Sequence, residues 1–198
     1  MVEFIPKRQK LMPTVKFKCC PKSFESRTIC DFWKWAYSDL MQNIERAVLA
    51  EYIVAVLLDV DKNPRVPWLS YDLKLPNGKK VEVKTMSRLQ AWYQKELSNP
   101  RVVIKPTRKW DPETSVMDDV SKFHSDLYVI CFFTAESHET ADPLNLTQWE
   151  FYTFTQGQIK KVLKESKSIS LKLLERLGIE PITAHELKNK VMQLCKLT

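Results

Sequence analysis

Three ionisable residues close together in the sequence carry the clearest chemical pattern of this chain. They are Asp72, Glu82 and Lys84, within the stretch YDLKLPNGKKVEVKT at residues 71–85. Two carboxylates that face each other repel, and one stays protonated unless a cation is present. Mg²⁺ suits such an oxygen-only site, because it binds one or two carboxylates, keeps several waters and accepts phosphate oxygens. With an ammonium nearby, these groups are the parts that phosphodiester hydrolysis by a metal-activated water requires.

Whether the three side chains meet depends on the turn of the hairpin that contains them. The tripeptide at 76–78, Pro-Asn-Gly, fits a three-residue loop with proline and asparagine in a type I turn and glycine left-handed. Asp72 then faces Glu82, and Lys84 lies on the same face because side chains alternate along a strand. A two-residue Asn-Gly loop would place Asp72 on the face away from Glu82. We prefer the three-residue loop because it uses the proline naturally.

A further carboxylate, Glu51, falls on the apolar side of a helix that precedes the hairpin. The pattern predicts this helix from Ser38 or Asp39 to about Leu58. A carboxylate on a buried helix face is costly unless it is paired or bound to a metal. Glu51 is therefore either a third metal ligand or one member of a salt bridge at the edge of the stripe. The apolar stripe on which it lies is expected to comprise Leu40, Ile44, Val48, Ala55 and Leu58.

The remaining pattern predicts an α/β layer structure with a mixed sheet. LYVICFF, residues 127–133, is continuously apolar, which is typical of a central strand covered on both faces. The segment SRLQAWYQKELS, residues 87–98, is expected to form a short helix or an ordered loop. Near the C-terminus, Thr183 and Glu186 form a capping box before a helix, and Gly178 and Pro181 end the helix before it. The other strands are expected at 68–75, 80–85, 101–105 and 149–154.

The composition of the chain narrows the classes of protein to which it can belong. With 198 residues, 44% hydrophobic and 28% charged, it fits a single soluble domain, and its net charge of +7 permits an anionic partner such as nucleic acid. No apolar run is long enough for a membrane helix and no signal peptide is evident, so we expect a cytoplasmic protein. Five cysteines without a CxxC pair indicate neither a disulfide framework nor a zinc ribbon. The three glycines form no nucleotide-binding motif.

Taken together, these residues resemble the PD-(D/E)XK superfamily of restriction-endonuclease-like nucleases. The matching positions are Asp72, then Glu82-Val83-Lys84 on the next strand, with Glu51 on the preceding helix. The resemblance implies an α-β-β-β-α-β core with a mixed central sheet flanked by helices, followed here by C-terminal helices. It also implies that Asp72, Glu82 and Glu51 bind Mg²⁺, for which Mn²⁺ can substitute, and that Lys84 assists the nucleophilic water. Tyr71 stands where the motif has a proline that binds no metal.

Further stretches look like one bacterial branch of that superfamily with no well-defined activity. The resemblance covers residues 31–152 and makes Gln90 an accessory polar residue of the site; the alternative is a surface glutamine. We expect an N-terminal arm at 1–30, a nuclease-like core at 31–155 and a helical extension at 156–198 packed on the core. The stretches concerned are DFWKWAYSDL (31–40), RAVLAEYIVA (46–55), SYDL (70–73), VEVKT (81–85), LQAW (89–92) and QWEFY (148–152).

The sequence therefore predicts a Mg²⁺-dependent nuclease that acts on nucleic acid, with double-stranded DNA as the expected substrate. A homodimer is plausible because cutting both strands of a duplex often uses two such sites. The alternative is a protein that keeps the fold and binds nucleic acid without cutting it, although a pure binder does not need the Asp, Glu and Lys trio. Trp92 either stacks on a base or packs in the core. The expected contacts to nucleic acid are Lys79, Lys80, Arg88, Trp92, Lys105, Arg108 and Lys109.

Overall fold

A computed structural model describes residues 9–67, 69–111, 116–165 and 168–196. Its centre is a four-stranded mixed sheet in the order β1-β2-β6-β7, with helices on both faces, so the expected α/β class is confirmed. The four strands are β1 (Leu73–Lys74), β2 (Lys80–Ser87), β6 (Leu127–Phe133) and β7 (Trp149–Thr155).

The strand β6 forms the middle of the sheet, as its apolar sequence predicts. It runs parallel to β2 and antiparallel to β7, and all seven of its side chains are buried. A strand of this kind needs apolar residues at every position, because helices cover both faces of the sheet around it. The expected strand at 149–154 is likewise present as β7.

The hairpin has the three-residue loop that its proline favours. The amide of Leu75 donates to the carbonyl of Lys79 over 2.8 Å, and Gly78 has a φ of +86°, the left-handed conformation that this loop requires. The first strand of the hairpin, β1, is much shorter than the expected strand at 68–75, since only Leu73 and Lys74 pair with β2. Residue 68 lies outside the described residues. Asp72, the residue before this ladder, binds β2 through its backbone amide and through its side chain.

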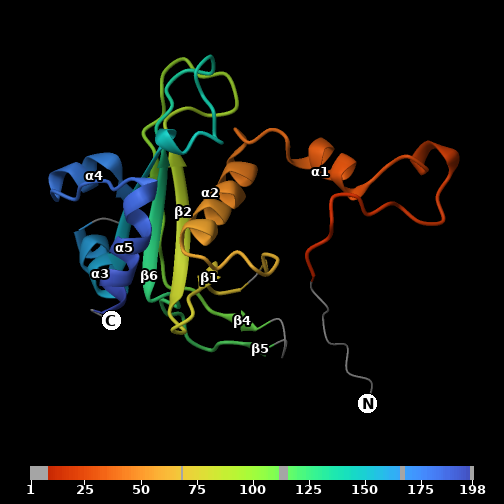
Figure 1. Cartoon of the computed structure of the whole chain (residues 1–198). Helices are drawn as coiled ribbons and strands as arrows, with labels where there is room; N and C mark the ends of the chain where they lie inside the picture. The colour runs from red at the N-terminus through yellow and green to blue at the C-terminus, as the bar shows by residue number, and fades with distance from the viewer. Residues whose placement is uncertain (1–8, 68, 112–115, 166–167, 197–198) are drawn as a thin grey trace.

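Two hydrophobic clusters lie on the two faces of the sheet. Helix α2 (Asn43–Leu57) packs with α5 (Ala184–Cys195) on the face that carries Val81 and Val83. Helices α3 (Gln156–Glu165) and α4 (Leu171–Arg176) pack on the other face, which carries Tyr128 and Ile130. Figure 1 shows α2 on one side of β2 and β6, with α3 and α4 on the other side.

Helix α2 begins later and buries a different face than its pattern predicts. It starts at Asn43, because Asp39 accepts hydrogen bonds from the Met41 amide and the Gln42 side chain in a turn before it. Of the expected stripe, Ile44 is 75% exposed and Val48 is also exposed, so that part of the prediction is wrong. The helix is apolar on nearly every side, so its periodicity does not single out the face that the sheet covers. The buried side chains are Arg46, Ala50, Glu51, Ile53, Val54 and Ala55.

Between β2 and β6, the described residues contain short strands and ordered loops, and no helix occupies the place that the α-β-β-β-α-β order assigns to one. The expected strand at 101–105 is reduced to β3 (Arg101–Val102), which pairs with β8 (Ile169–Ser170) outside the main sheet. A second small sheet joins β4 (Trp110–Asp111) to β5 (Val116–Met117). In segment 87–98 the expected ordered loop is present, and the side-chain amide of Gln94 donates to the carbonyl of Arg88.

The C-terminal helices follow their capping signals. Both hydrogen bonds of the expected capping box between Thr183 and Glu186 are present at the start of α5. Gly178, with a φ of +62°, follows the end of α4 and donates its amide to the carbonyl of Glu175. These ends form from local hydrogen bonds, which is why the sequence predicts them well.

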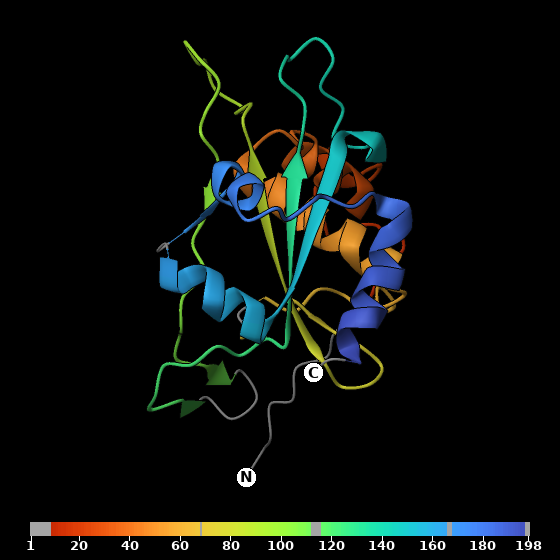
Figure 2. The ribbon, with the colours of Figure 1, turned by 90° about the vertical axis from the view of Figure 1, so that its left-hand side faces the viewer.

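The N-terminal part stands away from the sheet. It contains a short 3₁₀ helix, η1 (Lys22–Phe24), and the helix α1 (Ile29–Tyr37), and Figure 1 shows both projecting from the body of the molecule. Two loops, 88–100 and 134–148, extend past the ends of β2 and β6 (Figure 2). The second contains the 3₁₀ helix η2 (Leu146–Gln148). No helix among the residues described has the length and apolarity needed to cross a membrane.

Candidate active site

The predicted trio meets in one pocket beside the start of β2. Asp72, Glu82 and Lys84 all line a hollow of about 290 Å³. Glu82 and Lys84 alternate with Val81 and Val83, which are buried in the core on the opposite face of the strand. The strand therefore places its charged side chains in the pocket and its apolar side chains against α2.

Asp72 is held against β2 by two hydrogen bonds, one from its backbone amide and one to its carboxylate. Its amide donates to the carbonyl of Val81 over 3.0 Å, and its Oδ2 accepts a hydrogen bond of 2.7 Å from the amide of Val83. Burial and the nearby charge of Glu82 raise the pKa of Asp72 from 3.8 to about 6, although the hydrogen bond from Val83 acts in the opposite direction. The charge of Glu51 raises this pKa further. Asp72 is thus a carboxyl group that changes its charge state near neutral pH.

Glu82 and Lys84 form a close ion pair within the pocket. Lys84 Nζ donates to Glu82 Oε1 over 2.5 Å, and both side chains are partly exposed to solvent. The second oxygen of Glu82 lies 3.4 Å from the hydroxyl of Ser125, which donates to it weakly. The pocket therefore presents an ammonium and two carboxylates side by side, and solvent reaches the ammonium and the Glu82 carboxylate.

Glu51 is buried on α2 as expected, but its partner is a residue that sequence reasoning missed. Arg65 Nε donates to Glu51 Oε2 over 2.7 Å. Burial raises the pKa of Glu51 and the hydrogen bond from Arg65 lowers it, with burial the larger effect. Glu51 does not line the pocket, and its helix packs on the opposite face of the sheet. The salt bridge that the sequence left open as an alternative is therefore present, while the charge of Glu51 still reaches Asp72.

The other walls of the pocket come from segments that the sequence did not connect with the site. One wall is formed by residues 103–107 and includes Lys105, an expected contact to nucleic acid. Another is formed by residues 123–125 and Tyr128, and the ring of His124 lies with Nε2 2.7 Å from the carbonyl of Thr107. Burial, with Glu82 adding to it, raises the pKa of Tyr128, so this phenol stays neutral. Their position just before β6 is the signal that could have indicated 123–125, because β6 runs parallel to β2 and begins at the same end of the sheet.

The donor set of the pocket fits a divalent cation that keeps most of its waters. Among the residues described, no three acidic, histidine or cysteine side chains come together tightly enough to enclose a metal ion by themselves. Two carboxylates do share the pocket, and burial together with the charge of Glu82 raises the pKa of Asp72; a bound cation would offset both effects. Mg²⁺ needs one or two carboxylates when waters and phosphate oxygens supply the remaining ligands.

The expected contacts to nucleic acid separate into three groups. Lys105 lines the pocket, and the hairpin lysines lie at the same end of the sheet, where Lys79 pairs with Asp126 at 3.6 Å and Lys80 lies 5.2 Å from the centre of the Tyr71 ring. Arg88 and Trp92 instead follow the far end of β2. Arg108 and Lys109 lead into β4, and Arg108 donates to the backbone of Asp118.

Gln90 and Trp92 follow the far end of β2 and lie away from the pocket. The strand ends at Ser87, which is five residues of extended chain, about 16 Å, from Glu82 in the pocket. Gln90 is buried, and its side-chain amide donates to the carbonyl of Ser87. It therefore supports the turn after β2 and does not line the pocket. The side chain of Trp92 is 54% exposed, which decides against its packing in the core.

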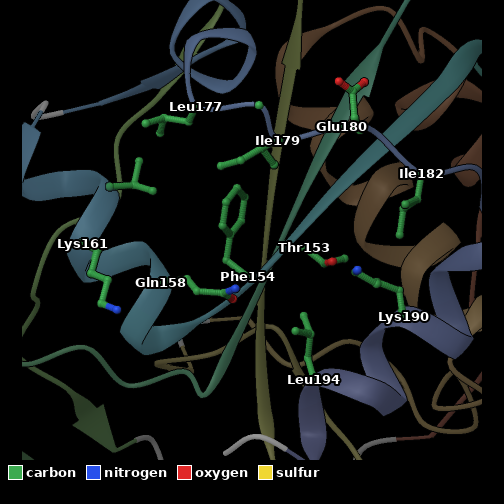
Figure 3. Close-up of a pocket in the computed structure, with 12 residues that line it drawn as sticks. Thr153, Phe154, Gln158, Lys161, Leu177, Ile179, Glu180, Ile182, Lys190 and Leu194 are labelled. Atoms are coloured by element: carbon green, nitrogen blue, oxygen red, sulfur yellow. The ribbon is translucent and has the colours of Figure 1, made fainter.

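A larger hollow, of about 570 Å³, lies between β7, α3 and α5 (Figure 3). Its floor is apolar and includes Phe154 and Ile179. Its charged side chains are Lys161, Lys190 and Glu180, which the close-up shows spread around the rim with Glu180 far from Lys161. This hollow contains none of the residues predicted to carry chemistry.

Comparison with known proteins agrees with a nuclease. Residues 32–172 match the family model of bacteriophage T4 endonuclease IV, which covers more than half of the chain. The chain belongs to this endonuclease family. No curated protein matches the sequence significantly.

Proposed function

We propose that this member of the bacteriophage T4 endonuclease IV family is a Mg²⁺-dependent enzyme that hydrolyses phosphodiester bonds of DNA with a PD-(D/E)XK-type site. The observation that carries the proposal is the convergence of Asp72, Glu82 and Lys84 in one pocket. The family match supports a nuclease, and the pocket supplies the groups by which a nuclease of this type would work. Double-stranded DNA is the proposed substrate, and the net charge of +7 favours such an anionic partner.

Asp72 and Glu82 would hold the metal ion, because they are the carboxylates that line the pocket. Mg²⁺ in such a site acts as a Lewis acid on phosphate oxygens and lowers the pKa of a water. Mn²⁺ would substitute for it, since both ions favour oxygen ligands. Glu51 joins this set only when Arg65 releases its carboxylate, because the two are bound to each other over 2.7 Å.

The side chains of the chain itself position the reactants. Lys84 is partly exposed, so its ammonium can donate to the attacking water or to a phosphate oxygen while Glu82 holds it in place. Asp72, with a pKa of about 6, is largely ionised at pH 7.5 and accepts the amide hydrogen of Val83, which fixes its orientation. Lys105 also lines the pocket and would bind the phosphate that follows or precedes the cut.

An assay of supercoiled plasmid, linear duplex and single strands tests this function. We expect cleavage with Mg²⁺ or Mn²⁺, none with excess chelator, and a loss of about 10²- to 10⁴-fold in Lys84→Ala. Lys172→Ala is the matched control, because Lys172 is an exposed lysine of α4 outside the pocket. Equal rates in wild type and Lys84→Ala would remove the proposed role of this lysine.

One observation favours the alternative of a protein that binds DNA without cutting it. Two of the three predicted metal ligands are already paired with side-chain cations, Glu82 with Lys84 and Glu51 with Arg65. Under this alternative, DNA binding persists while no divalent cation yields cleavage. A gel-shift titration run beside the plasmid assay distinguishes the two, since Lys84→Ala would then change the affinity alone.

A further inference from the structure

The outer face of α2 is apolar along its whole length. The side chains exposed on this helix after Asn43 are Ile44, Ala47, Val48, Tyr52 and Val56, and none of them is charged. Ile44 is 75% exposed and Tyr52 is 57% exposed. Residues four apart lie on one side of a helix, so four of these five side chains form a continuous stripe. A helix that is apolar on every side is normally buried on every side.

Residues 9–37, which comprise the described part of the N-terminal arm together with α1 and are called the arm below, present a second apolar surface. None of the residues of α1 is buried, and Trp35 is 85% exposed. An isolated helix of nine residues is marginal in water without packing, so α1 needs a surface to lie against. Figure 1 shows α1 and the segment before it standing away from α2 and the sheet. The exposed large apolar side chains of the arm are Leu11, Met12, Val15, Phe17, Phe24, Phe32, Trp35 and Tyr37.

We propose that these two surfaces cover each other between two copies of the chain, with the arm of each copy packed on the outer face of α2 of the other. A symmetric pair buries both apolar surfaces at once, and the same patch serves on both subunits. The exchange of an identical segment between subunits is an inexpensive route to a dimer. This inference does not depend on the proposed nuclease activity, because it concerns residues outside the pocket.

A second copy is favoured over another partner by the position and charge of the arm. The arm precedes α2 in the sequence, and its first described part lies near the residues that follow this helix, since Lys10 and Asp61 of the same chain form an ion pair at 3.6 Å. An exchanged arm can form this pair across the dimer, because both groups are present in each copy. The exposed face of α2 between Asn43 and Val56 has no charged group to repel the basic side chains that accompany the arm.

Sedimentation velocity and light scattering of the full chain over a range of concentrations test the dimer. We expect a mass of twice 23.3 kDa for wild type. Ile44→Glu and Trp35→Glu, one on each surface, should each weaken the dimer about tenfold or more, because a carboxylate would be buried without a partner. Leu144→Glu is the control and should stay dimeric, since Leu144 is 66% exposed in the loop before β7. Because both tested side chains are exposed in the single chain, the variants should keep the circular dichroism spectrum of wild type.

Photo-crosslinking tests whether the arm acts on the partner. Chains with a benzoylphenylalanine in place of Trp35 are mixed with ¹⁵N-labelled wild type and irradiated. Peptides that join residue 35 of one isotope to α2 of the other support exchange. Links within a single chain only, or a monomer at every concentration, overturn the proposal. An assembly that neither Ile44→Glu nor Trp35→Glu weakens overturns it as well.

Discussion

Two hollows in the part of the chain that the structure describes differ in size and in chemistry, and the smaller one is the candidate site. The hollow between β7, α3 and α5 has about twice the volume of the pocket beside β2, 570 against 290 Å³. Its floor is apolar and its charges lie apart on the rim. In the smaller pocket, two carboxylates and an ammonium lie together, and burial and the charge of Glu82 raise the pKa of Asp72 to about 6. Convergent ionisable groups mark this site more clearly than volume does.

The largest expected effect comes from replacing one glutamate by glutamine in each hollow and comparing the cleavage rates. Glu82→Gln should lower the cleavage rate by about 10²- to 10³-fold, because it removes a charge that holds the cation and the ammonium. Glu180→Gln, on the rim of the larger hollow, should leave the rate unchanged. Single-turnover cleavage of a plasmid measures both variants, and equal losses would contradict the assignment of the site.

The free energy of unfolding should show the cost of burying the ionised Asp72 carboxylate, and its measurement needs no assay of activity. Its folded pKa of about 6 lies above the ordinary value of 3.8, so the folded state binds more protons between these pH values and stability falls as pH rises from about 4 to 6. Asp72→Asn keeps an oxygen for the amide of Val83 and removes this cost. We expect it to raise the free energy of unfolding by up to about 3 kcal/mol at pH 7.5.

Urea unfolding in chelator at pH 4 and pH 7.5 measures this difference. The gain in Asp72→Asn should shrink toward zero at pH 4, where the wild-type carboxyl is protonated in the folded state. An Asp72→Asn gain that is the same at both values, or absent at both, would show that Asp72 is not strained by burial and by Glu82.

Binding of Mg²⁺ should stabilise wild type and not Asp72→Asn. A cation present at ten times its dissociation constant adds about 1.4 kcal/mol to the free energy of unfolding. Thermal unfolding with and without Mg²⁺ measures the shift, with Lys161→Ala as the control from the larger hollow, which should respond as wild type does. If Mg²⁺ stabilised Asp72→Asn as much as wild type, the cation would bind outside this pocket.

The smallest expected effect concerns Arg65, which neutralises Glu51 beside the site. Arg65→Ala should lower the Mg²⁺ concentration for half-maximal cleavage by roughly two- to fivefold, the equivalent of about 0.4–1 kcal/mol for a partly exposed ion pair. The double variant Arg65→Ala with Glu51→Gln should return toward the wild-type requirement. A higher Mg²⁺ requirement in Arg65→Ala would indicate that Arg65 organises the site and does not compete with the cation.

Short-range signals in the sequence predicted much of the fold. The loop at 76–78 formed because proline, asparagine and glycine each favour the conformation of their own position, and this placed Asp72 and Glu82 by the same pocket. The buried strand 127–133 and the capped helix α5 also follow from local composition. Longer-range features were less predictable, since the strand expected at 101–105 found its partner in β8, far away in the sequence.

By itself, the sequence determined that an acidic and a basic side chain alternate with valines along β2, and it favoured the hairpin register that brings Asp72 beside them, which the structure confirmed. Only the tertiary structure decided which face of α2 is buried, because both faces are apolar and periodicity does not distinguish them. It also decided that Glu51 pairs with Arg65 and that residues 103–107 and 123–125 wall the pocket. Turns and strand alternation depend on neighbouring residues, whereas ion pairs and pocket walls depend on segments that only folding brings together.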